Sequence, residues 1–189
     1  MDDPRKIWQN QEVEEMKLSV EELRAKAAKF QSRIRWRNVR EQVAALIVIV
    51  LIGRFLWETH VTVERIGFAL VIAGAVYYVW HLRKWGAPKF LPADMGRADC
   101  IKFYRGELER QRDLLRSVWK WAIGPLIPGL LLIFTYSIAA APSAERWRPI
   151  ISVTVSSAII VVIGWMNQRA ARRLDARITE LNRDLTSFL

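Results

Sequence analysis

Few side chains of this protein belong to the kinds that carry out chemistry, and several of those lie inside strongly apolar stretches. Arg54 interrupts the first stretch, while Ser152 and Ser156 recur one helical turn apart in the fourth. In lipid, such groups could contact an ion or a polar substrate. Alternatively, Arg54 extends to the headgroups beyond Trp57, and the serines hydrogen-bond between packed helices. Arg54, Ser152 and Ser156 form a candidate intramembrane polar site.

Residues suited to catalysis or metal binding are sparse. His60 and His81 stand toward opposite ends of two apolar stretches, so we expect them on opposite faces of a membrane. Cys100 is the only cysteine, which excludes a disulfide and a cysteine-based zinc site within one chain. No nucleophile elbow, phosphate-binding glycine loop or zinc-protease motif occurs. We therefore expect no catalytic residue, no metal and no cofactor, and a protein that is not an enzyme.

Four apolar stretches, near 43–57, 66–82, 122–141 and 150–166, indicate the class of protein. Crossing the hydrocarbon takes about 20 helical residues, and the stretches reach that length with their Trp, Tyr and Thr flanks. Within so short a segment only a helix satisfies its own backbone hydrogen bonds. The sequence predicts an all-α membrane protein with four transmembrane helices.

The distribution of charge predicts how these helices are oriented. The chain carries a net charge of +10, and 25 of its 29 Lys and Arg residues lie in segments 1–42, 83–120 and 166–189. By the positive-inside rule, both termini are expected in the cytoplasm, with the helices in a bacterial inner membrane. We expect the basic groups to meet anionic lipid headgroups rather than nucleic acid.

Each of the three cytoplasmic segments carries a heptad-like apolar stripe, with spacings of three and four residues. Ser19 and Glu22 form a capping box that predicts a helix start at about Val20. The middle stripe includes a polar residue, Gln111. The stripes are expected to pack on one another, within one chain or between chains. Candidate arm-packing residues are Val20, Leu23, Phe30, Ile34, Ile101, Leu108, Leu115, Leu174, Ile178, Leu181 and Leu185.

Proline and glycine predict local features of the middle spans. Pro125 and Pro128 lack amide donors and should kink the third span near its inner end. A broken transporter helix is the alternative, but the other spans show no matching break. Gly67 and Gly74 share a small-residue face of the second span, which favours close helix packing.

These features divide the chain into six parts. The predicted order is a mobile or docking arm (1–18), a cytoplasmic amphipathic helix (19–42), a transmembrane hairpin (43–85, with helices at about 43–60 and 64–85), a cytoplasmic loop and amphipathic helix (86–120), a second hairpin (121–167, with helices at about 121–141 and 149–167) and a C-terminal cytoplasmic amphipathic helix (168–189).

The N-terminal region carries a family resemblance. It contains Ile7-Trp8-Gln9-Asn10-Gln11, then the cap from Leu18 to Arg24 and an arginine-rich run from Arg33 to Arg40. Over about the first 50 residues it resembles uncharacterised bacterial inner-membrane proteins with a Trp-Gln-x-Gln stretch. A location of such proteins near alternative sigma factors would imply membrane-linked regulation.

Three functions are compatible with these observations. The leading hypothesis is a non-enzymatic regulatory or scaffolding module that acts through its cytoplasmic helical arms. Its partner would be a second copy of the chain or a cytosolic protein. The alternative is a small oligomeric channel or transporter that uses the candidate polar site. The third is a membrane-tethered sigma-factor regulator, although a single cysteine and four spans depart from the usual anti-sigma pattern.

Overall fold

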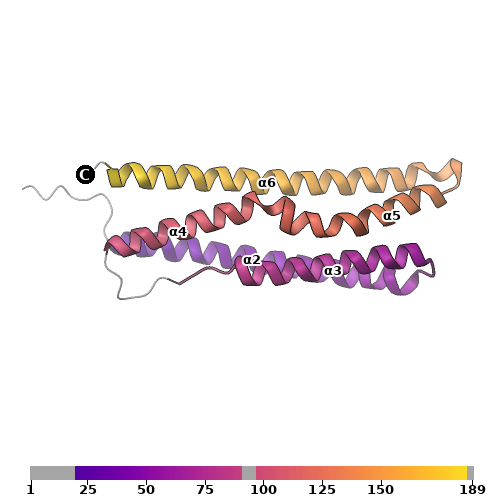
Figure 1. Ribbon diagram of the computed structural model, residues 1–189, viewed down its shortest axis with the longest axis horizontal. Helices are drawn as coiled ribbons and strands as arrows, with labels where there is room; N and C mark the ends of the chain where they lie inside the picture. The colour runs from indigo at the N-terminus through magenta and orange to yellow at the C-terminus, as the bar shows by residue number, and fades with distance from the viewer. Residues whose placement is uncertain (1–19, 91–96, 187–189) are drawn as a thin grey trace, which may run out of the picture.

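The computed structural model describes residues 20–90 and 97–186, so the predicted arm 1–18 lies outside the described residues. These residues form helices and no strand. The elements are α2 (Val20–Glu58), α3 (Thr62–Trp85), α4 (Arg97–Arg116), a π-helical turn η1 (Trp119–Ile123), a 3-10 turn η2 (Gly124–Leu126), α5 (Ile127–Ala140), a second 3-10 turn η3 (Ser143–Glu145) and α6 (Trp147–Thr186). Figure 1 shows the helices lying along one long axis.

Two helices run nearly the full length of the molecule. α2 has 39 residues and α6 has 40, so at about 1.5 Å per residue each is close to 60 Å long. In both, a charged half continues into an apolar half without a break in the helix. The predicted cytoplasmic helix 19–42 and the first apolar stretch are therefore parts of one rigid element.

Three helical segments in the described part of the chain are long and apolar enough to cross a membrane. They are Thr62–Trp85, Trp119–Ala140 and Ser143–Arg183. This agrees with the predicted class, an all-helical membrane protein. The apolar half of α2 is not among the three: Glu41 and Glu58 bound it and Arg54 interrupts it, which shortens its uncharged length.

The apolar halves pack through glycines. α3 lies between α2 and α5, and its Gly67 faces Gly129 of α5. A Cβ atom on Gly129 would lie 2.6 Å from the Gly67 carbonyl oxygen, and one on Gly74 would lie 2.9 Å from the Pro125 carbonyl oxygen. The two backbones therefore approach as closely as small residues allow.

Between α4 and α5 the chain leaves regular α-helical geometry, and Figure 1 shows a sideways step there. The π-helical turn η1 is followed directly by η2, which contains Pro125, and Pro128 is the second residue of α5. Neither proline donates a backbone hydrogen bond, so the regular hydrogen bonding of an α-helix is interrupted on this stretch. Trp119 of the π-helical turn lies against Gly164 of α6, whose missing side chain leaves room for the indole.

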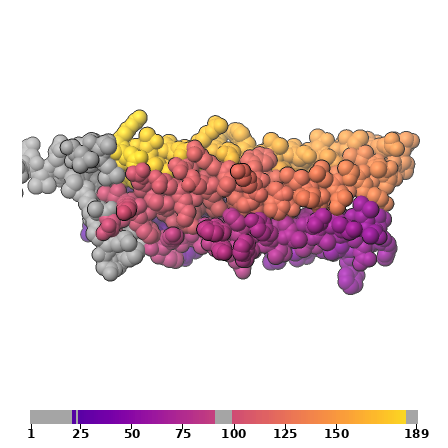
Figure 2. Space-filling model, viewed as in Figure 1, coloured from indigo at the N-terminus to yellow at the C-terminus, as the bar shows by residue number. Residues whose placement is uncertain are grey.

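The charged halves of α2, α4 and α6 converge on an apolar core, which we call the arm cluster. It consists of Phe30, Ile34, Leu108, Leu115, Ala171, Leu174 and Ile178. Tyr104 packs at its edge, where its ring meets Phe30 edge-on at a centroid distance of 6.1 Å. Burial raises the pKa of the Tyr104 hydroxyl. The three arms thus form a folded bundle within a single chain, and Figure 2 shows α4 packed between its neighbours.

A second apolar cluster links this bundle to the apolar half. It contains Leu82 of α3, Leu114 and Val118 near the end of α4, and Trp121 and Ala122 of the π-helical turn. The Trp121 indole donates its Nε1 hydrogen to the Leu114 carbonyl at 2.9 Å. The irregular segment is therefore held by packing as well as by its backbone.

Candidate functional site: a polar junction between arms and spans

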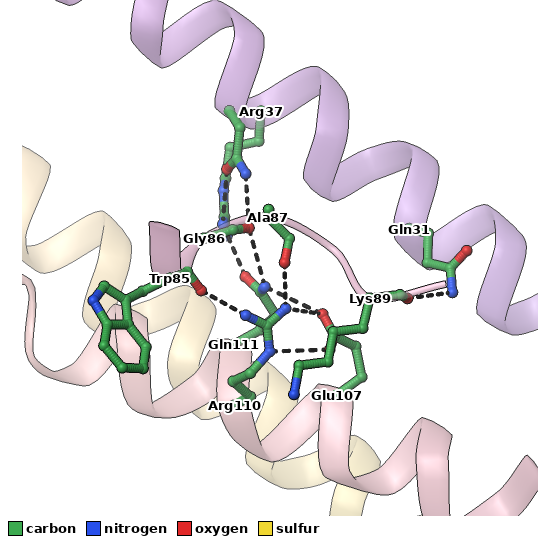
Figure 3. Close-up of polar contacts among 10 residues, drawn as sticks. Gln31, Arg37, Trp85, Gly86, Ala87, Lys89, Glu107, Arg110 and Gln111 are labelled. Atoms are coloured by element: carbon green, nitrogen blue, oxygen red, sulfur yellow. Dashed lines mark hydrogen bonds and ion pairs between the residues drawn. The ribbon is translucent and has the colours of Figure 1, made fainter. Parts of the chain in front are cut away.

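Polar side chains gather where α3 ends and the chain turns back along the arms (Figure 3). We call this group the polar junction. It comprises Arg37 and Asn38 of α2, the backbone of Trp85, Gly86 and Ala87, and Glu107, Arg110 and Gln111 of α4. It sits between the arm cluster and the apolar halves, so it is the place where the two parts of the molecule are joined.

The end of α3 creates a need for hydrogen-bond donors at this place. The last carbonyls of a helix have no partner within the helix, and Pro88 prevents the helix from continuing. Gly86 is buried, and a Cβ atom there would lie 2.6 Å from the Leu82 carbonyl oxygen. Glycine therefore lets the chain turn tightly and leaves several carbonyls directed at neighbouring helices.

Donors from two other helices meet these carbonyls. Asn38 donates from Nδ2 to the Gly86 carbonyl at 2.7 Å, and Gln111 Nε2 approaches the same oxygen at 3.4 Å. Arg110 donates to the Trp85 carbonyl at 2.6 Å and to the Ala87 carbonyl at 2.5 Å. A cation at a helix C-terminus also offsets the negative end of the helix dipole.

The charge of Arg110 is balanced inside the junction. Its Nη2 donates to Glu107 Oε1 at 2.6 Å and its Nε to Oε2 at 3.0 Å, which is a two-point guanidinium–carboxylate pair. The Glu107 side chain is only 3% exposed. Gln111 is fully buried and accepts a hydrogen bond from Arg37 Nη2 at 2.9 Å. These buried groups therefore have partners, as low-dielectric surroundings require, whereas the buried Arg37 Nε makes no hydrogen bond and lies 3.8 Å from Glu41.

The network extends along α2 in both directions. Toward the apolar half, Tyr78 of α3 donates to Glu41 Oε2 at 3.0 Å, and Arg37 Nε lies 3.8 Å from the other oxygen of Glu41. Toward the arm end, Gln31 donates to the Lys89 carbonyl at 2.8 Å. The connection after α3 is thus attached to α2 at two points, by Asn38 and by Gln31 two turns away.

The junction holds three helices together. Its donors and acceptors are engaged with one another, and its one carboxylate is neutralised by Arg110. Across residues 20–90 and 97–186, no group of His, Cys, Asp and Glu side chains is arranged to hold a metal ion. The junction's hydrogen bonds fix the position of the end of α3 relative to α2 and α4.

The structure places Arg54 and the two serines of the candidate intramembrane polar site on different helices, α2 and α6. Arg54 is exposed and pairs with Glu58 on its own helix at 2.8 Å. Ser152 is exposed and Ser156 is half-buried on α6, whose principal neighbours are α4 and α5. The three residues do not form one site within the chain.

The structure brings together most of the candidate arm-packing residues that it describes. Phe30, Ile34, Leu108, Leu115, Leu174 and Ile178 all belong to the arm cluster. Leu181 is buried outside that cluster, and Ile101 is half-buried. The side chains of Val20, Leu23 and Leu185 lie outside the described ones.

Sequence reasoning did not identify the polar junction. A signal was present, because Gln111 occupies a core position of an apolar stripe and Asn38 follows Ile34 by four residues. An amide at such a position predicts a buried hydrogen-bond network. Its partners could not be foreseen, since they are carbonyls of a turn far away in sequence.

Comparison with protein-family models, with curated proteins and with solved structures finds no match. The resemblance of the N-terminal region to uncharacterised bacterial inner-membrane proteins stays a prediction.

Proposed function

We propose that this chain is a non-enzymatic, four-span protein of the bacterial inner membrane that presents a folded cytoplasmic helical bundle as a regulatory or scaffolding module. The observation that carries the proposal is the arm cluster, which unites α2, α4 and α6 of one chain. Because α2 and α6 continue from the bundle into the apolar half, the bundle is a rigid extension of the membrane helices.

Packing supports a fourth span in the apolar half of α2. Only Thr59, His60 and Val61 connect α2 to α3, and the two helices pack against each other. If α3 crosses the membrane, the adjoining part of α2 lies at the same depth. Arg54 and Glu58 would then sit near the outer surface as a mutually neutralising pair.

The polar junction supports a mechanical coupling between the membrane helices and the cytoplasmic arms, which a regulatory module needs. A displacement of α3 within the membrane must move the Gly86 carbonyl, and Asn38 and Gln111 carry that movement to α2 and α4. The channel alternative would use Arg54 and the serines of α6, and within one chain these residues lie on different helices.

The proposal is tested by unfolding the arms alone. Leu108 is 1% exposed at the centre of the arm cluster, so Leu108→Asp should open the bundle while the spans stay inserted. Ala28→Asp introduces the same charge at an exposed position of α2 and should leave the bundle folded. Cross-linking in intact cells, followed by mass spectrometry, would compare both variants with the unaltered chain.

We expect a specific cytosolic protein to be cross-linked to the unaltered chain and to Ala28→Asp, and to be lost from Leu108→Asp. Adducts that persist when the bundle is opened, or adducts between copies of the chain alone, would contradict a cytoplasmic docking module.

A further inference from the structure

The arm half of α6 carries a group of four arginines. Arg169, Arg172, Arg173 and Arg177 are all exposed. The one carboxylate among them, Asp175, is instead bound to α4, with Arg112 at 3.3 Å and Arg116 at 2.7 Å. Among the described residues, no carboxylate pairs with the four.

Three of these arginines share the outward side of the helix. The residues that α6 contributes to the arm cluster are Ala171, Leu174 and Ile178, and with about 3.6 residues per turn Arg169, Arg172 and Arg173 fall on the opposite side, while Arg177 lies on the flank. α6 runs along one edge of the molecule, so this side faces the surroundings (Figure 1).

The same side of α6 is apolar one turn earlier, which places the arginines relative to a bilayer. Val162, Trp165 and Met166 are exposed, as lipid-facing residues are, and Arg169 lies over the Trp165 ring at 5.4 Å from its centroid. An indole and a cation stacked at the end of an apolar run are typical of the headgroup level.

Helix geometry then gives each arginine a depth. At about 1.5 Å per residue, Arg169 lies some 5 Å beyond Met166, Arg172 and Arg173 about 9 to 11 Å, and Arg177 about 16 Å. The headgroup layer is roughly 5 to 8 Å thick, and the Debye length in physiological salt is about 8 Å. The first three can therefore reach headgroup phosphates with their long side chains, whereas Arg177 lies too far away.

We propose that Arg169, Arg172 and Arg173, with Trp165 beneath them, form a binding surface for the phosphates of anionic phospholipids in the cytoplasmic leaflet. Guanidinium groups match phosphate oxygens with two parallel hydrogen bonds, and these three have no carboxylate among the described residues to compete. The inference rests on the proposed membrane placement, to which it adds a lipid class and named residues.

The test uses the full chain in nanodiscs that contain equal amounts of phosphatidylglycerol and phosphatidylcholine. Native mass spectrometry measures the ratio of the two lipids that stay bound. We expect phosphatidylglycerol to be enriched on the unaltered chain and the enrichment to fall about five-fold in Arg173→Gln. Arg177→Gln is the matched control: it removes the same charge one turn farther along the helix and should change the ratio by less than about two-fold.

Three outcomes would overturn the proposal: equal retention of both lipids by the unaltered chain, equal effects of the two variants, or loss of the enrichment in millimolar inorganic phosphate, which would indicate an unselective anion site. A chain that folds but does not enter nanodiscs would overturn the membrane placement itself. These arginines are exposed, so circular dichroism of each variant should match the unaltered chain and exclude misfolding.

Discussion

At the scale of single residues, two arginine–glutamate pairs of α4 differ in what they do. Arg105 and Glu109 pair at 3.0 Å with side chains 46% and 37% exposed, so solvent reaches both groups. Arg110 pairs with Glu107, whose side chain is 3% exposed, and also holds two carbonyls beyond α3. An exposed pair contributes about 0 to 1 kcal/mol, whereas removing one partner of a buried pair leaves an uncompensated charge.

Arg110→Ala should therefore lower the free energy of unfolding of the arm bundle by about 3 to 5 kcal/mol. Arg105→Ala removes the same side chain from the same helix and should lower it by less than about 1 kcal/mol. Denaturant unfolding in detergent, followed by circular dichroism, measures both. Equal effects of the two substitutions would show that the polar junction does not stabilise the bundle.

At the scale of elements, the contact between α3 and α5 depends on missing side chains. Gly67 and Gly129 bring two backbones together, and any Cβ atom on Gly129 would meet a carbonyl oxygen that cannot rotate away. Gly53, in the apolar half of α2, has no such neighbour within 4 Å. The same residue type thus has a packing role in one helix and none in the other.

Gly129→Ala should separate α3 from α5 and lower stability by about 1 to 3 kcal/mol, because overpacking forces the helices apart. Gly53→Ala should be neutral or slightly stabilising, since alanine has the higher helix propensity. Thermal unfolding of the purified variants, monitored by tryptophan fluorescence, provides the comparison. If Gly129→Ala melts at the temperature of Gly53→Ala, the close approach of the two backbones is not what holds these helices together.

At the scale of the whole molecule, the arrangement of helices predicts how the chain crosses the membrane. α2 and α3 form one hairpin and α5 and α6 another, and Figure 1 places the turns of both at the same end of the molecule. The arm cluster lies toward the other end. In a four-span protein both turns lie on one side of the membrane and the arms on the other, and the positive-inside rule predicts that the arms are on the cytoplasmic side.

Cysteine labelling can test this topology, because Cys100 is the only native cysteine and Cys100→Ala provides a thiol-free background. His60→Cys and Ser143→Cys, one in each turn, should react with a membrane-impermeant maleimide in intact cells. Arg172→Cys should react only after the membrane is permeabilised. Ala28→Cys, at an exposed position in the arm half of α2, should behave as Arg172→Cys does. Labelling of Ala28→Cys in intact cells together with His60→Cys would mean that α2 does not cross.

Much of this molecule follows from local patterns in the sequence. Apolar runs longer than ordinary core helices predict a helical membrane protein, since lipid offers the backbone no hydrogen-bond partners, and three such helices are present. The periodicity of three and four residues also shows which side of each arm is apolar. Both are properties of consecutive residues, so they are visible without any knowledge of the fold.

Only the tertiary structure decided which of these faces meet. The arm stripes could have paired between chains, and the path of the chain brings Phe30, Leu108 and Leu174 together within one. Asn38 bonds to a carbonyl 48 residues away, and Arg37 to an amide 74 residues away. Arg54 stays apart from Ser152 and Ser156 because α2 and α6 do not pack closely on each other. Local periodicity specifies a face, whereas the partner of that face depends on where distant helices lie in space.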